Sequence, residues 1–335
     1  MKKFYLLLAA ALLALAPDTA RAAELAFTRW GGDGEYYVWH FDTKSGKESR
    51  RVKGYDPEIH PAGGVIVYTR YDKDGGRRVA FCSSDKKTQD AASGYIARKM
   101  KEKGFIPNDY GARWSPDGRW LLFSRFADGE RWTPVILSPI IYKGGSTPEF
   151  SPAAQNGADG GDFFSPFWSH DSKAFFVSDL NAVHRFSAVY GHPPKLEESI
   201  PFERILPSEN IIISSATRFS VSADGSAWLF AAEAGGEECA FCAAAGNPAN
   251  TKGVLFIYRP GGGAAAERVD TGGLCVADAA WLGSEIVFSA HSPMEKKSRA
   301  NSANLYDIYR MKQGGKPRKI INNGQNVSAS REAAN

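Results

Sequence analysis

The chain of 335 residues lacks several features that would assign it to a common class of protein. Beyond residue 16 it has no apolar run long enough to cross a membrane as a helix. It has no Gly-x-Ser-x-Gly pentapeptide, and this excludes a peptidase that carries its nucleophile on an α/β-hydrolase elbow. It has no basic stripe, and its formal net charge is only +4, so nothing indicates a nucleic-acid partner.

The first residues have the pattern of an export signal. Basic residues at positions 2 and 3 precede an apolar run over residues 4–16, and Ala20-Arg21-Ala22 supplies a small-x-small cleavage site. The pattern predicts a signal peptide over residues 1–22 and a mature chain over residues 23–335. Loss of the signal peptide removes three basic residues and one acidic residue, which lowers the formal charge from +4 to +2. We therefore expect an exported, soluble protein of the bacterial periplasm, without a transmembrane segment in the mature chain.

A repeat of fifty-odd residues runs through the mature chain. Its clearest copy reads Trp-Ser-Pro-Asp-Gly from Trp114, followed by a short apolar run ending at Phe123. Pro and Gly preset a tight turn, and an apolar run of this length is typical of a strand covered on both faces. Five copies begin at Ile59, Trp114, Trp168, Val221 and Trp281.

Repetition of strands and turns at this period indicates a β-propeller. A second strand without a first, around Leu25–Trp30, adds a sixth unit, and its missing inner strand is expected from Asn326–Ala329. The sequence therefore predicts an all-β fold: a six-bladed β-propeller of four-stranded blades in one domain, residues 23–335, with the ring closed by pairing of the N- and C-terminal segments. A basic, helix-like tract over residues 86–103 is expected in place of one outer strand.

The Trp-Ser-Pro-Asp-Gly turn, the apolar run and the following Ser-Arg-aromatic triplet, as in Ser124-Arg125-Phe126, resemble the propeller repeat of the TolB family. The resemblance covers nearly the whole mature chain and concerns the propeller alone, without the α/β domain that precedes it in TolB. TolB is a periplasmic protein of the Tol–Pal envelope system. The resemblance therefore implies an envelope protein that binds a protein partner.

Three of the four cysteines are expected near one corner of the ring. Cys239 and Cys242 fall in an insert, Cys275 in the next loop on the same face, and His291 at the start of another insert. These residues could form a disulfide, as exported proteins often do, or a metal site with three thiolates and one imidazole. A thiol-exchange role is a third alternative, whereas Cys82 is expected to be a buried thiol.

The mouth of the central channel is expected to lie on that same face. Aromatic and charged residues precede the inner strands there: Tyr55, Asp56, Glu58, Tyr110, Arg113, Arg218 and Asp278. Such a lining suits a peptide segment or a small polar ligand. In the alternative interpretation, the five charged side chains pair with one another and with channel water.

The sequence favours a monomeric, non-catalytic scaffold that binds an envelope protein or peptide and uses no cofactor. Charge reversal at Arg218 or Asp278 is expected to weaken binding and leave the fold intact. Two alternatives belong to other classes: a metal-dependent polysaccharide lyase or hydrolase of propeller fold, and a redox or metal-handling assembly factor acting through the cysteine corner. The six histidines are scattered, with His60 and His170 expected at the far end of the channel.

Overall fold

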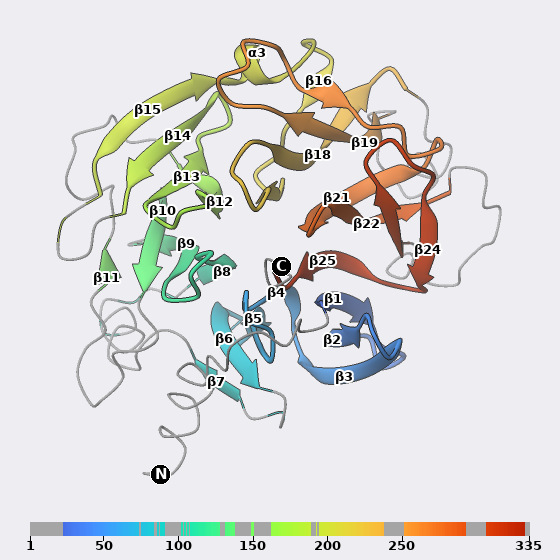
Figure 1. Cartoon of the computed structure of the whole chain (residues 1–335). Helices are drawn as coiled ribbons and strands as arrows, with labels where there is room; N and C mark the ends of the chain where they lie inside the picture. Colours follow the sequence, from blue (N-terminus) through green and yellow to red (C-terminus); the bar gives the residue numbers. More distant parts are fainter. Residues whose placement is uncertain are drawn as a thin grey trace.

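A computed structural model describes residues 23–73, 75–83, 86, 88–90, 102, 104, 106, 108–127, 131–137, 149–150, 162–188, 192, 194–237, 251–292 and 306–331. The predicted signal peptide lies outside these residues. Within them almost all regular structure is β, and no helix is long and apolar enough to cross a membrane. The sheets stand radially around a common centre, as Figure 1 shows.

The first sheet combines the two ends of the described chain. Its strand order is β25-β1-β2-β3, with all pairs antiparallel. Leu25 of β1 pairs with Ala329 of β25, and Ala26 with Ser328. The inner strand thus comes from the segment that the sequence indicated. The strands are β1 (Glu24–Trp30), β2 (Tyr36–Asp42), β3 (Lys47–Lys53) and β25 (Gln325–Ala329).

Two of the expected blades form a single eight-stranded sheet. The first strand set is β4 (Tyr55–Ile59), β5 (Val65–Tyr71), β6 (Arg77–Ser83) and β7 (Thr88–Asp90), and the second is β8 (Asn108–Trp114), β9 (Leu121–Ala127), β10 (Arg131–Leu137) and β11 (Glu149–Phe150). A parallel pair between Arg77 and Asn108 joins the two sets.

The structure therefore shows five blades, and the prediction of six separate blades is wrong. The cause is the short outer strand β7, which pairs only with Ala80, Phe81 and Cys82 of β6. Because β7 does not extend to Arg77, Asn108 of β8 pairs with β6 at that residue. Apart from β7, the tract predicted to be helix-like lies mostly outside the described residues.

The remaining sheets are antiparallel and follow the chain order from the inside outward. Their inner, second, third and outer strands are β12 (Phe164–Trp168), β13 (Ala174–Ser178), β14 (Ala182–Ser187) and β15 (Leu196–Pro201); β17 (Phe219–Val221), β18 (Trp228–Gly235), β19 (Thr251–Tyr258) and β20 (Glu267–Arg268); and β21 (Cys275–Leu282), β22 (Glu285–His291), β23 (Asp307–Lys312) and β24 (Arg318–Ile321). A short helix, α3 (Phe202–Ile205), follows β15, and β16 (Ile211–Ile212) pairs with β18.

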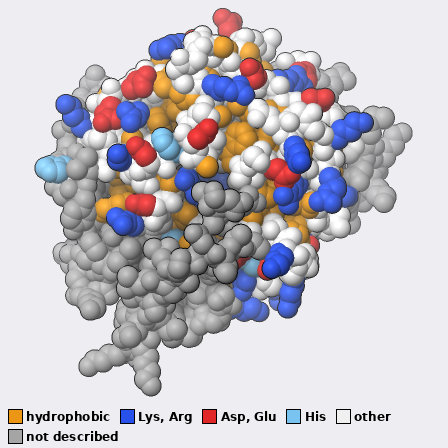
Figure 2. All heavy atoms as spheres, in the orientation of Figure 1, with side chains coloured by type: hydrophobic (Ala, Val, Ile, Leu, Met, Phe, Trp, Pro, Cys, Tyr) orange, Lys and Arg blue, Asp and Glu red, His pale blue; other side chains and the backbone are white. Residues whose placement is uncertain are grey.

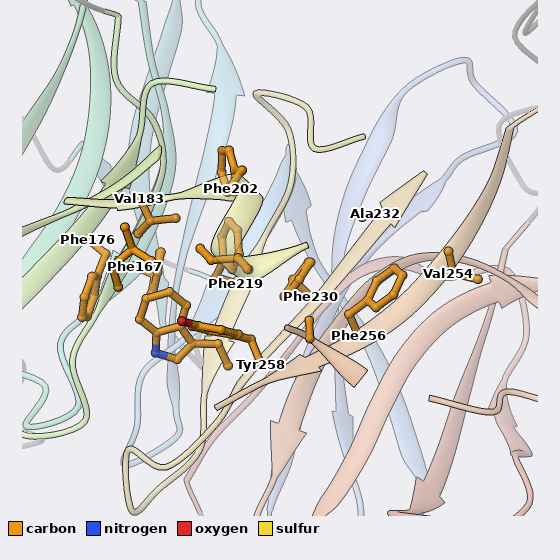
Figure 3. Packing of buried hydrophobic residues seen from close by; sticks show 14 of the residues in the cluster. Phe167, Phe176, Val183, Phe202, Phe219, Phe230, Ala232, Val254, Phe256 and Tyr258 are labelled. Atoms are coloured by element: carbon orange, nitrogen blue, oxygen red, sulfur yellow. The ribbon is translucent and has the colours of Figure 1, made fainter. Parts of the chain in front are cut away.

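The repeated turn forms as its residue types predict. Gly118 adopts a φ of 70° and its amide donates to the carbonyl of Ser115 at 2.8 Å. The second strand that follows is buried on both faces, as all five residues of β13 illustrate. Aromatic side chains of adjacent sheets fill the space between them. Phe167, Phe219 and Phe230, for example, share one buried cluster (Figure 3).

The inner strands line the centre of the molecule. In the order β25, β4, β8, β12, β17 and β21 each contacts the next, and β21 contacts β25 (Figure 1). This arrangement brings residues that are far apart in the sequence to one channel. On the face seen in Figure 2, basic and acidic side chains are interspersed around the rim.

Candidate functional site

A β-bulge shapes four of the inner strands at equivalent positions. Asp56 of β4, Gly111 of β8, Ser165 of β12 and Asn326 of β25 all have a positive φ, from 48° to 70°. The pairing register of each strand shifts around that residue. A bulge bends a strand and redirects the side chains beside it. Here the bulges bring charged residues that flank them toward the channel.

Four of the predicted charged residues form a buried ionic cluster. Arg113 Nη2 lies 3.3 Å from Asp56 Oδ1, and Arg218 Nε lies 3.6 Å from the same oxygen. Arg218 Nη2 lies 3.1 Å from Glu58 Oε2. The side chain of Arg218 is only 9% exposed and that of Glu58 only 23%. Mutual pairing, the alternative to an open charged mouth, thus describes how these four residues are arranged.

Asp278 completes the cluster but holds backbone groups. Its Oδ1 accepts the Val327 amide at 2.7 Å, and its Oδ2 accepts the Asn326 amide at 2.8 Å and the Ser289 hydroxyl. Asp278 thereby fastens β25 to β21, and it is only 4% exposed. Charge reversal at this residue would disturb the fold, contrary to the expectation from the sequence. Charge reversal at Arg218 would disturb the fold as well, because its guanidinium group also donates to the backbone carbonyls of Pro57 and Val327.

Burial and the neighbouring charges shift the pKa values of the cluster in opposite directions. Burial alone raises the pKa of Asp56, but the charges of Arg113 and Arg218 outweigh it and hold the pKa below the usual value. For Glu58 burial outweighs the attraction of the same two guanidinium groups, and for Asp278 it outweighs that of Arg218 and the hydrogen bonds, so the pKa values of both carboxyl groups are raised. The pKa of Arg218 is raised because the carboxylates outweigh its desolvation. Three carboxyl groups thus share two guanidinium groups, and the excess carboxyl is prone to take a proton.

The cluster separates two cavities in the channel. The loop-side cavity, about 340 Å³, lies where the chain enters the inner strands. The turn-side cavity, about 370 Å³, reaches the repeated turns at the other end. Arg113 and Arg218 line both cavities, Asp56 only the first and Glu58 only the second. Tyr55 and Tyr110 line the loop-side cavity, whereas Asp278 is in neither lining.

An aromatic wall, with the guanidinium group of Arg77 over it, characterises the loop-side cavity. The ring of Tyr110 lies edge-on to Trp132 with their centroids 4.9 Å apart. Arg77 lies over both rings, 4.7 Å from the centroid of Tyr110 and 5.3 Å from that of Trp132. Burial raises the pKa of Tyr110 to about 12 and also raises that of Tyr55, so both phenols remain neutral donors.

Sequence reasoning missed Arg77 and Trp132. Both come from third strands, β6 and β10, and the repeat pattern assigned only inner strands to the channel. The presence of Arg77 in the wall follows from the parallel contact that merges two blades, since Arg77 itself pairs with Asn108 and donates to its side chain. No local signal in the sequence predicts that contact.

The cysteine corner is described only in part. Cys239 and Cys242 lie outside the described residues. Cys275 and His291 are buried and pair across β21 and β22, and both line a further cavity of about 250 Å³. A disulfide or a metal site at this corner therefore stays a prediction.

The described histidines are engaged separately. His40 Nε2 lies 2.8 Å from Glu24, His184 Nε2 lies 3.1 Å from Asp179, and His60 Nε2 lies 3.2 Å from the carbonyl of Gly118 in the neighbouring turn. Across the described part of the chain, no three His, Cys, Asp or Glu side chains are grouped to hold a metal ion. The metal-dependent lyase alternative thus has no support from these residues.

Radial antiparallel sheets around a two-part channel define a β-propeller. Among solved structures the chain is similar to TolB from Acinetobacter baumannii, with 14% identity and a TM-score of 0.55 over 98% of this chain and 72% of that one. It is also similar to the β-propeller domain of the Trilobed protease from Pyrococcus furiosus, with 12% identity and a TM-score of 0.50 over 91% of this chain and 98% of that one.

Puromycin hydrolase is a third similar structure, with 15% identity and a TM-score of 0.51 over 92% of this chain and 48% of that one. At these identities the likeness establishes the fold alone. No protein-family model and no curated protein sequence matches the chain.

Proposed function

We propose that this protein is a non-catalytic β-propeller of the bacterial cell envelope, and that it binds a peptide segment of a protein partner in the loop-side cavity. The proposal includes export through the signal peptide at residues 1–22, a monomeric domain over residues 23–335, and a ring closed through the pairing of β25 with β1. The observation that carries it is the wall of Tyr110, Trp132 and Arg77 in the loop-side cavity, above the ionic cluster of paired side chains.

The composition of the wall suits a protein ligand. Tyrosine, tryptophan and arginine dominate the binding energy of protein interfaces, because they combine large apolar surface with hydrogen-bonding groups. The neutral hydroxyl of Tyr110 can donate to a peptide carbonyl, and the Arg77 guanidinium, held over two rings, can donate to a second carbonyl or to a carboxylate. Strands β6, β8 and β10 hold this wall in place before binding, so that little conformational entropy is lost.

The same lining argues against chemistry at this site. It lies entirely within the described residues and contains neither histidine nor cysteine. The cluster beneath it pairs its guanidinium groups with Asp56 and Glu58, which leaves no side chain arranged as a nucleophile with an adjacent base. The resemblance of the repeat to TolB favours the same conclusion.

Capture of the partner by the tagged mature protein, from an envelope extract, tests the proposal. The partner is identified by mass spectrometry, and its affinity is then measured with purified components. Trp132→Ala should weaken binding by about thirtyfold, because it removes a large anchoring surface. Arg77→Gln should weaken it by about tenfold.

Arg119→Gln is the matched control, because its side chain is 74% exposed in a turn and lines neither cavity. Thermal unfolding verifies that each variant is folded. Unchanged affinity in both Trp132→Ala and Arg77→Gln would show that the partner does not use the loop-side cavity.

A further inference from the structure

The turn-side cavity is a second space in the channel, and the proposed function does not use it. Trp114, Phe167, Phe219 and Trp281 are among the aromatic residues that line it. Its inner end is the ionic cluster, and its outer end reaches Arg331, which follows β25. A volume of about 370 Å³ falls in the range of small-molecule pockets, about 300–1,000 Å³.

Arg331 carries a charge that no neighbour matches. Its backbone amide donates to the carbonyl of Pro61, but among the described residues its guanidinium makes no hydrogen bond or ion pair. Burial lowers the pKa of Arg331, and the more distant carboxylate of Asp117 offsets this only in part. That carboxylate is engaged within its own turn by the Ser115 hydroxyl and the Arg119 amide.

Two tryptophans of the same lining have unmatched donors. The Nε1 atoms of Trp114 and Trp281 are buried without a hydrogen-bond partner in the described part of the chain. In contrast, Trp168 of the same lining donates its Nε1 hydrogen to the Arg113 carbonyl at 3.0 Å. Because both Nε1 atoms are fully buried, they do not open onto the cavity, and other atoms of Trp114 and Trp281 line it.

Within the described part of the chain, an aromatic cavity therefore has an unpaired guanidinium group at its outer end. We infer that the turn-side cavity binds a small carboxylate with an apolar or aromatic body, its carboxylate against Arg331 and its body against the aromatic residues of the lining. A guanidinium binds a carboxylate through two parallel hydrogen bonds. Aromatic walls suit a flat apolar body.

Two sources can present this chemistry: a free aromatic acid, or the last residue of a peptide chain. The probes are 3-phenylpropionate for the first and N-acetyl-phenylalanine for the second. N-acetyl-phenylalanine amide is the matched neutral ligand. Binding to the purified mature chain is followed by calorimetry and by the indole N–H signals of protein labelled with 15N-tryptophan, with Trp114 and Trp281 assigned from Trp→Phe variants.

Both acids should bind with Kd on the order of 1 mM or lower, and both assigned indole signals should move. The amide should bind about tenfold more weakly, and Arg331→Gln should weaken the acids by a similar factor. Arg331→Lys should restore part of that affinity, which a purely structural role would not predict. A tighter complex with N-acetyl-phenylalanine than with 3-phenylpropionate indicates a chain end as the source, and the reverse indicates a free acid.

Arg119→Gln and Arg77→Gln are controls for an exposed guanidinium and for the loop-side cavity, and neither should change the affinity of the acids. Equal binding of acid and amide, unmoved indole signals, or undiminished binding by Arg331→Gln would each overturn the inference. Capture of a protein partner at the loop-side cavity should be unaffected by Arg331→Gln, so the two proposals fail independently.

Discussion

Asp278→Ala should release the C-terminal strand from its neighbour. The wild-type carboxylate accepts the amides of Asn326 and Val327 at 2.8 and 2.7 Å, together with the Ser289 hydroxyl. Those amides belong to β25, the inner strand that pairs with β1. The substitution removes their acceptor at a position that is only 4% exposed, where water cannot readily replace it.

The magnitude follows from the groups left behind. Each buried amide without an acceptor costs about 1–3 kcal/mol, so the two together cost about 2–6 kcal/mol. The raised pKa of Asp278 indicates that its charge is poorly compensated, and loss of that charge offsets part of the cost. We expect the free energy of unfolding to fall by about 3 kcal/mol, and the Tm to fall by about 6 °C.

Urea denaturation of the mature chain measures the free energy of unfolding, and hydrogen exchange with mass spectrometry localises the effect. Peptides that cover β25 should lose protection before those of the other sheets. Asp270→Ala is the control, because this exposed aspartate accepts one amide, that of Gly272. A loss below about 0.5 kcal/mol, the usual range for surface substitutions, would refute the conclusion that Asp278 fastens β25 to β21. Unchanged exchange in β25 would refute it as well.

Three further predictions concern the channel and the sheets around it. The pKa of Glu58 is raised, so the Glu58 carboxyl group should cost the wild type stability as pH rises from about 4.5 through that pKa. Glu58→Gln has no group that titrates there, so its unfolding free energy, measured by urea titration, should increase relative to that of the wild type as pH rises. Gly253→Ala should cost about 3 kcal/mol or more, because its Cβ would lie 2.0 Å from the Val276 carbonyl oxygen, while Gly32→Ala, with no atom within 4 Å, should cost little. Deletion of residues 325–335 should expose the edge of β1 and promote aggregation, measured by light scattering.

The radial fold could be predicted because each strand is signalled locally. The turn at Ser115–Gly118 and the apolar run after it recur along the chain, and the structure places inner and second strands at those copies. The pairing of β25 with β1 could be anticipated for a related reason: the strand at Leu25–Trp30 needs an inner neighbour. Local patterns suffice wherever a strand pairs with the next one in the sequence.

The number of blades and the depth of the charges could not be predicted in this way. The merged sheet depends on one parallel pair, Arg77 with Asn108, between segments separated by the shortened outer strand. The sequence pattern placed Asp56, Arg113 and Arg218 at one mouth, but in the structure they lie between two cavities, with Asp56 and Arg113 on bulged strands. The bulges depend on positive φ values at Asp56 and Ser165. Neither aspartate nor serine requires a positive φ, so the residue types do not predict these bulges.

Photo-crosslinking from the loop-side cavity tests the central claim most directly. A photoreactive residue at position 110, whose ring lies against Trp132, is compared in intact cells with one at position 119, which lies in an exposed turn. The account predicts one dominant adduct with an envelope protein from position 110 and none from position 119, and it predicts that Arg77→Gln diminishes the adduct. Adducts equal at both positions, or none at position 110, would contradict the assignment of this cavity as the binding site.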